Sequence, residues 1–204
     1  MMNPVIETIH ERRSVRSYKP NPIPKDVLQT LVEAGHQAPA RGLTKTAGES
    51  FSHQPWRFVV VQDATLRKNL AEVANPLWAE MMAGMQETHP ETYKSLMTEY
   101  EATNGKKDMV FYAAPVIIFV IGPMGYEISC SLACENVMIA ATSLGLGSCY
   151  VGFGATVVGI DAVAETLGVK DGERVFGPIV VGYPSPESAA EPAPDRGKPD
   201  VRFI

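Results

Sequence analysis

The chain has 204 residues, of which 45% are hydrophobic and 20% are charged, and its formal net charge is −5. This length allows one domain with a full core, and the composition is that of a globular protein rather than a disordered one. The negative balance argues against a general nucleic-acid surface, and no uncharged stretch reaches the ~20 residues that span a bilayer.

The start of the chain and its cysteines favour a cytoplasmic protein. Residues 1–12 lack the apolar run of a secretory signal peptide. The three cysteines show no spacing typical of a disulfide framework, which fits a reducing compartment. We therefore expect a cytoplasmic protein that binds neither nucleic acid nor membrane.

The predicted elements alternate between helices and a few strands. Apolar residues at helical spacing predict a first helix over 4–13, and a second helix is predicted from Pro24 to Gly35. Residues 40–53 read as a long polar loop. After it we expect a strand over 56–61 that is covered on both faces, and helices over 64–108 that are broken at Pro76 and Pro90. A strand over 114–121, a helix over 127–143 and a glycine-rich turn over 145–154 are expected next. The chain is then expected to form a helix over 160–167, a strand over 177–183 and a Pro- and Glu-rich arm over 184–204. This order predicts an α+β fold in one domain, residues 1–204.

A basic cluster near the start has the chemistry of a phosphate site. Arg12, Arg13 and Arg16 supply guanidinium groups, and Ser14 supplies a hydroxyl, which are the donors that a partly desolvated phosphate requires. The same arginines could instead complement the dipole of the helix that they end. Further along, Gln54 before Pro55 and Trp56 could face the hydrogen-bonding edge of a cofactor, or could only mark the entry to a buried strand.

The sequence resembles the FMN-dependent nitroreductase family over nearly its whole length. The matching segments follow the family's order, at residues 11–18, 38–39, 53–61, 113–118, 131–136, 140–152 and 180–184. The resemblance implies an obligate homodimer with two FMN sites at the subunit interface. We expect a central, mostly antiparallel sheet of four or five strands wrapped by helices. The apolar residues 201–204 are expected to join the edge of the partner's sheet, because a free strand needs one.

The resemblance also implies roles for particular residues. Those expected at the phosphate are Arg12, Arg13 and Ser14, and Arg16 is expected at the N1/O2 edge of the ring, where reduction leaves negative charge. Those expected to contact the flavin from the other subunit are Pro39, Ala40, Ser52 and Gln54. The backbone of Tyr150, Val151 and Gly152 is expected to run along the ring with an N–H aimed at N5. Arg196 and Lys198 are both candidates for a further phosphate contact, and the sequence does not decide between them.

Some features depart from the family's pattern or allow a plainer interpretation. Residues 41–51 form an insertion where relatives have a short turn, and Ser52 stands where relatives usually have Asn.

The glycines of 145–152 could serve only as a helix cap and a tight turn. The cysteines are expected to pack rather than to bind metal, since no further ligands stand at suitable spacing. The methionines of 76–100 could belong to the core, or could form a pliable wall over the flavin.

The resemblance implies a flavin-dependent oxidoreductase. A reduced nicotinamide nucleotide, NADH or NADPH, would give hydride to flavin N5 and leave, and a nitroaromatic, quinone or similar acceptor would then take two electrons. This ping-pong scheme needs no protein acid or base, so no catalytic side chain is expected. A second hypothesis is a flavin-storage or electron-transfer protein without NAD(P)H turnover. Specialised flavin chemistry, such as reductive dehalogenation, stays a third possibility.

Overall fold

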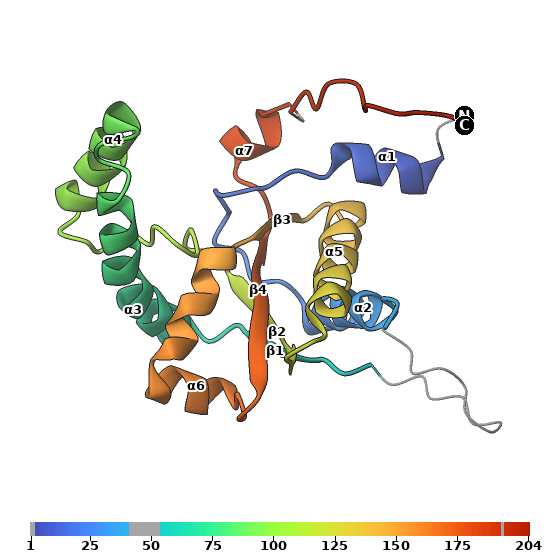
Figure 1. Ribbon diagram of the computed structural model, residues 1–204, viewed down its shortest axis with the longest axis horizontal. Helices are drawn as coiled ribbons and strands as arrows, with labels where there is room; N and C mark the ends of the chain where they lie inside the picture. The colour runs from blue at the N-terminus through green and yellow to red at the C-terminus, as the bar shows by residue number, and fades with distance from the viewer. Residues whose placement is uncertain (1–2, 41–53, 193) are drawn as a thin grey trace.

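A four-stranded antiparallel sheet forms the centre of the molecule in the computed structural model, which describes residues 3–40, 54–192 and 194–204 (Figure 1). Its strands are β1 (Arg57–Val61), β2 (Val116–Pro123), β3 (Gly147–Tyr150) and β4 (Glu173–Gly182), in the order β1-β2-β4-β3. The two central strands are almost entirely apolar, and all residues of 116–121 and 176–181 are buried. The predicted α+β fold with an antiparallel sheet is confirmed.

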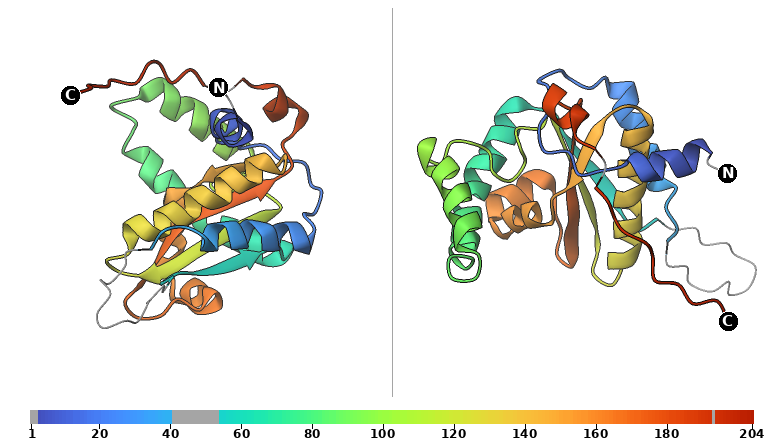
Figure 2. Two further views of the ribbon diagram at one scale, coloured as in Figure 1. Left: turned by 90° about the vertical axis from the view of Figure 1, so that its right-hand side faces the viewer. Right: turned by 90° about the horizontal axis from the view of Figure 1, so that it is seen from above.

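Helices cover both faces of the sheet. They are α1 (Pro4–Glu11), α2 (Lys25–His36), α3 (Ala64–Ala83), α4 (Pro90–Ala102), α5 (Glu127–Ser143), the 3-10 helix η1 (Gly152–Gly159), α6 (Asp161–Leu167) and α7 (Pro186–Ala190). Helices α2 and α5 lie on one face, and α3, η1 and α6 lie on the other (Figure 1). Beyond α7 the chain runs as an extended arm (Figure 2).

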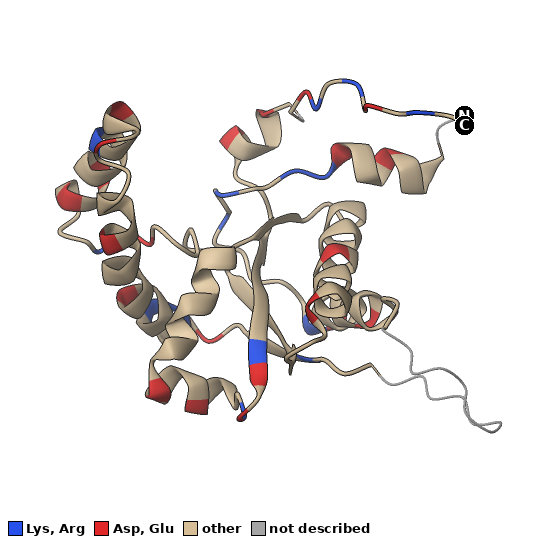
Figure 3. Ribbon diagram, in the orientation of Figure 1, with Lys and Arg blue, Asp and Glu red and all other residues tan. Residues whose placement is uncertain are grey.

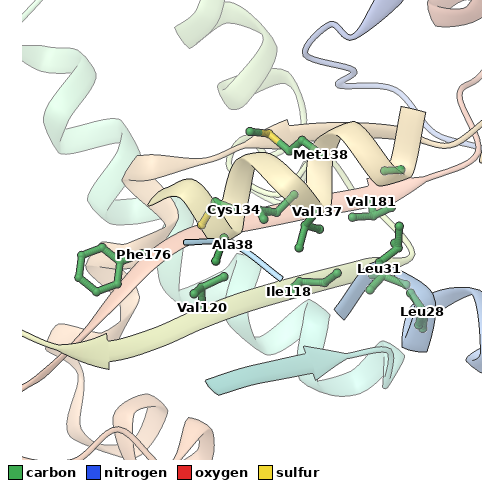
Figure 4. Packing of buried hydrophobic residues seen from close by; sticks show 14 of the residues in the cluster. Leu28, Leu31, Ala38, Ile118, Val120, Cys134, Val137, Met138, Phe176 and Val181 are labelled. Atoms are coloured by element: carbon green, nitrogen blue, oxygen red, sulfur yellow. The ribbon is translucent and has the colours of Figure 1, made fainter. Parts of the chain in front are cut away.

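The sheet separates two apolar cores. Under α2 and α5, Leu31, Val137 and Val181 pack with Ile118 from β2 (Figure 4). The other core joins α3 and η1 to the opposite face of β2 and β4. Cys130 and Cys134 lie fully buried in the first core, where burial raises their pKa values to about 11 and about 12. Thiols held neutral in this way pack as small apolar groups.

Several sequence predictions of elements are corrected by the structure. Helix α3 continues through Pro76, because Ala74, Trp78 and Met82 keep one apolar face buried on both sides of the proline. Strand β1 lies at the sheet edge and is only partly buried, so it is not covered on both faces. The predicted turn over 145–154 contains β3, and the predicted arm contains α7. The predicted break at Pro90 is confirmed, since α3 ends at Ala83 and α4 begins at Pro90.

Candidate functional site

The basic segment that follows α1 is fixed across the end of β3. The N–H of Val15 donates to the carbonyl of Ser148 at 2.9 Å, and the N–H of Lys19 donates to the carbonyl of Tyr183 at 2.8 Å. Gly147 permits this crossing, because a Cβ atom there would stand 2.8 Å from the Val15 side chain. Figure 3 shows the run of basic residues directly after α1. The crossing therefore places Ser14 and Arg16 at the edge of the sheet.

Arg12 and Arg13 have acidic partners on different helices. The Arg12 Nε atom lies 3.6 Å from the Glu135 carboxylate on α5. The Arg13 guanidinium lies 3.4 Å from Glu191 and also donates to the carbonyl of Ser188 in α7. Since both glutamates are half or more exposed, such pairs contribute only ~0–1 kcal/mol, and a phosphate dianion could compete for either arginine. The donor set fits a phosphate, and the two guanidinium groups are held by different acidic partners.

Arg16 differs from its two neighbours. Among the residues that the structure describes it forms no ion pair, and its guanidinium carbon lies 5.9 Å from the centre of the Tyr112 ring. Burial lowers the pKa of Arg16, but Cys149, Tyr112 and Tyr18 together outweigh burial and raise it, so the side chain stays charged. Arg16 is thus an exposed cation whose charge no carboxylate balances in the described part of the chain.

The strand-to-helix turn after β3 offers one backbone donor. The N–H of Val151 is taken, since it donates to the carbonyl of Pro178 at 2.8 Å. Gly152 begins η1, and the first N–H of a helix has no partner within that helix. Tyr150 is 41% exposed beside it. Val151 is therefore excluded as the donor, and the Gly152 N–H is the one in this turn that can be directed at a ligand.

A cavity of about 770 Å³ opens beside Arg16. Its walls come from Tyr18, from α3 and α4, and from the segment 107–113, and include Trp78, Met82, Met85, Leu96 and Tyr112. The other charges around it are compensated: Lys107 pairs with Glu99, and the Asp108 carboxylate accepts three backbone N–H bonds. The cavity is accordingly apolar and aromatic, with one uncompensated cation at its edge. This size suits a small organic molecule.

Sequence reasoning found only part of this cavity. Arg16 was predicted, and Met82 and Met85 belong to the Met-rich stretch that was expected either in the core or in a wall. Tyr112 and Trp78 were missed. Tyr112 directly precedes the stretch 113–118 that resembles the family, and nothing local in the sequence around it points to a site.

The remaining predicted residues lie elsewhere. Pro39 and Ala40 line a smaller cavity of about 390 Å³ with Tyr126 and Leu132, at the start of α5 and apart from Arg16. Gln54 lies half-buried just before β1, and Ser52 falls outside the described residues, as does the insertion 41–51. Arg196 and Lys198 are exposed on the C-terminal arm, on either side of Gly197.

The described residues lack two other features that would point to a different function. They contain no group of three or more His, Cys, Asp or Glu side chains placed to hold a metal ion. None of their helices combines the length and apolar character that crossing a bilayer requires.

Comparison with known proteins gives consistent results. The family model described as "Nitroreductase family" matches residues 9–183 of this chain. An Archaeoglobus fulgidus protein with the proposed name NADH dehydrogenase/NAD(P)H nitroreductase is 27% identical over 199 residues, covering 98% of this chain and 96% of its own. Among solved structures, a nitroreductase with bound FMN from Desulfitobacterium hafniense covers 100% of both chains with a TM-score of 0.75 at 24% identity. Another with bound FMN, from Bacteroides fragilis, covers 100% of this chain and 99% of its own at 26% identity, with a TM-score of 0.68. The fold, the sequence match and the order of the site segments agree, and the chain belongs to the nitroreductase family.

Proposed function

We propose that this protein is an FMN-dependent NAD(P)H oxidoreductase that works by a ping-pong mechanism. The observation that carries the proposal is Arg16, a cation without a carboxylate partner among the described residues, at the edge of an apolar, aromatic cavity. Bound FMN would supply the redox chemistry, taking hydride at N5 and passing two electrons to an acceptor. The relatives support it through their names, which specify bound FMN for two structures and NAD(P)H for the archaeal protein.

The chain's own residues would bind and tune the cofactor. Arg12, Arg13 and Ser14 would hold the phosphate, exchanging weak carboxylate pairs for a stronger dianion. Arg16 would lie at the N1/O2 edge and stabilise the negative charge that reduction leaves there. The Gly152 N–H would point at N5. Arg196 or Lys198 would reach the phosphate only if the C-terminal arm folds back, since both are exposed on it here.

A homodimer would complete the site. Pro39 and Ala40 line a different cavity from Arg16, so a second chain would bring both sets to one flavin. Gln54, and Ser52 outside the described residues, would belong to the same set as Pro39, as the family resemblance implies. Apolar side chains are exposed on α1 (Val5, Ile9), on α5 (Ile128, Leu132) and on the tail (Phe203, Ile204). An exposed apolar surface of this kind marks an interface. We infer an obligate dimer in which residues 201–204 extend the partner's sheet.

The acceptor would enter the cavity beside Arg16. Its indole, phenol and thioether walls favour flat, weakly polar molecules such as nitroaromatics and quinones. Met82 and Met85 would let the wall adapt to acceptors of different shape, because methionine side chains are flexible and polarizable. Broad acceptor use is the expected consequence.

The test begins with the purified protein and added FMN. Tight binding of FMN, followed by oxidation of NADH or NADPH with menadione or nitrofurazone as the acceptor, is the expected result. A protein that stays colourless after FMN is added would refute the proposal. A yellow protein without turnover from either nucleotide would instead indicate flavin storage or electron transfer from another protein.

A further inference from the structure

Two consecutive residues next to Arg16 have an unusual backbone. Tyr112 has φ 56° and Ala113 has φ 50°, which is the left-handed region that residues other than glycine, asparagine and aspartate seldom adopt. Backbone strain of this kind persists only where the surroundings impose it, and it is concentrated at functional sites. The conformation of Tyr112 therefore calls for a reason beyond packing.

Hydrogen bonds from two side chains impose this conformation. The Asp108 carboxylate accepts the N–H groups of Val110, Phe111 and Ala113 at 3.1, 2.7 and 3.0 Å. On the preceding side, Asn75 of α3 donates to the carbonyls of Gly105 and Lys107, each at 2.8 Å, and accepts the N–H of Met109. The segment 105–113 is thus tied to α3 at one end and folded around Asp108 at the other.

The result of this conformation is the placement of the Tyr112 ring against Arg16. The guanidinium carbon lies 5.9 Å from the ring centre, within the range of a cation–π contact. Arg12 and Arg13 are held by glutamates, whereas Arg16 is held by a neutral ring. The difference matters electrostatically, because a carboxylate would neutralise the guanidinium while an aromatic face orients it and leaves its charge in place.

We propose that Tyr112 is the positioning residue for Arg16, which it orients without neutralising, so that the full positive charge is available where negative charge forms on the reduced flavin. This inference rests on the proposed FMN function, and it assigns a role to a residue outside the predicted phosphate and ring contacts. Tyr112 acts through Arg16 and needs no contact with the reacting atoms.

The reduction potential of bound FMN is the measurement that tests this role, and Tyr112→Asn is the main variant. Asparagine accepts a left-handed backbone, so the segment keeps its path while the ring is lost. We expect the equilibrium constant for flavin reduction to fall about tenfold, or ~30 mV for a two-electron couple. Tyr112→Phe keeps the ring and should restore most of the potential. Tyr93→Leu, a tyrosine of α4 away from this cavity, is the matched control and should leave the potential unchanged.

A double-mutant cycle separates positioning from a direct effect. In an Arg16→Met background, Tyr112→Asn should cause no further change in potential, because Tyr112 acts through the guanidinium. An unchanged potential in Tyr112→Asn alone, or the same shift with and without Arg16, would overturn the inference. Failure of the wild-type protein to bind FMN would refute the proposed function instead, so the two failures are distinguishable. If Tyr112→Asn does not fold, Tyr112→His replaces it in the same double-mutant cycle, and the same reduction potential is measured, since histidine also tolerates this backbone.

Discussion

At the level of single residues, the three arginines of the N-terminal segment are distinguished by their partners. Arg12 and Arg13 each face an exposed glutamate, and an ion pair of this kind is easily exchanged for a stronger anion. Arg16 faces the Tyr112 ring and keeps its charge unbalanced within the described residues. Residues of one type, within a span of five, are thereby suited to two tasks: holding a phosphate and stabilising charge on a ring.

A fourth arginine has a structural task that can be tested by pH. Arg57 in β1 lies 2.8 Å from the Glu173 carboxylate and also donates to the carbonyl of Gly168, so it joins the edge strand to the start of β4. The hydrogen bond from Arg57 holds the pKa of Glu173 below its ordinary value. A depressed carboxylate pKa stabilises the fold above the unfolded pKa of about 4.3, and this stabilisation is lost as pH falls through the lower, folded value.

Glu173→Gln is therefore expected to lower the free energy of unfolding by about 1 kcal/mol at pH 7, since the pair is partly exposed. Chemical denaturation of both proteins at pH 7 and at pH 3 measures this. The difference between them should be smaller at pH 3 than at pH 7, because the contribution of the Glu173 carboxylate is lost as pH falls from the unfolded pKa of about 4.3 through the lower, folded value. A difference that is the same at both pH values would show that the charge of Glu173 does not contribute.

At the level of elements, the crossing of the basic segment over β3 depends on one glycine. A Cβ atom at Gly147 would stand 2.8 Å from three atoms of Val15, closer than real Cβ contacts. Gly147→Ala is expected to displace the segment that carries Ser14 and Arg16, to destabilise the fold by about 1–3 kcal/mol and to weaken FMN binding. Thermal unfolding and FMN titration provide the measurements.

Gly159→Ala serves as the control for this substitution. Gly159 ends η1, has an ordinary backbone conformation, and has nothing within 4 Å of an added Cβ atom. Stability and FMN affinity should both stay close to wild type. Equal FMN affinity in Gly147→Ala and Gly159→Ala would contradict the importance of the crossing for the cofactor.

The elements also show what local sequence can and cannot predict. The long α5 helix and both central strands followed from apolar patterning alone. Pro76 was a misleading signal, because burial of Trp78 and Met82 outweighs the hydrogen bond that the proline removes. Strand β3 could not be predicted because residues 147–150 contain glycine and serine, and their pairing with β4 makes them a strand.

The candidate site, like the secondary-structure elements, was predicted only in part from the sequence. Arg16 could be predicted because it lies in the segment 11–18 that matches the family, and its position in that motif implies its role. Tyr112 could not, because tyrosine has no preference for a left-handed backbone, and bonds from Asp108 and from Asn75 on α3 impose that conformation. Trp78 reaches the same cavity from a helix more than 60 residues away from Arg16 in the sequence, as the numbering shows. Contacts of this kind follow from tertiary structure alone.

At the level of the whole molecule, the distribution of exposed apolar side chains favours a dimer. Leu132 lies on α5 and lines the small cavity with Pro39 and Ala40. Leu132→Glu would place a charge in the proposed interface, so we expect this variant to be a monomer of 22.1 kDa while the wild type has twice that mass. Because the partner would supply part of the site, FMN affinity should fall with the loss of the dimer.

Light scattering coupled to size-exclusion chromatography measures the mass, and flavin absorbance measures the binding. Met81→Glu is the matched control, since Met81 is similarly exposed but lies on α3. It should remain a dimer with bound FMN. A wild-type monomer, or a Leu132→Glu monomer that binds FMN normally, would contradict a site built from two chains.

The central claim is that the chain holds a flavin which a reduced nicotinamide nucleotide can reduce. Anaerobic titration of the FMN-loaded protein with NADH, and separately with NADPH, tests it most directly. The visible absorption band of the flavin should bleach in proportion to the nucleotide added, for at least one of the two, and should return when menadione is introduced. A bound flavin that stays oxidised in an excess of both nucleotides would contradict the account.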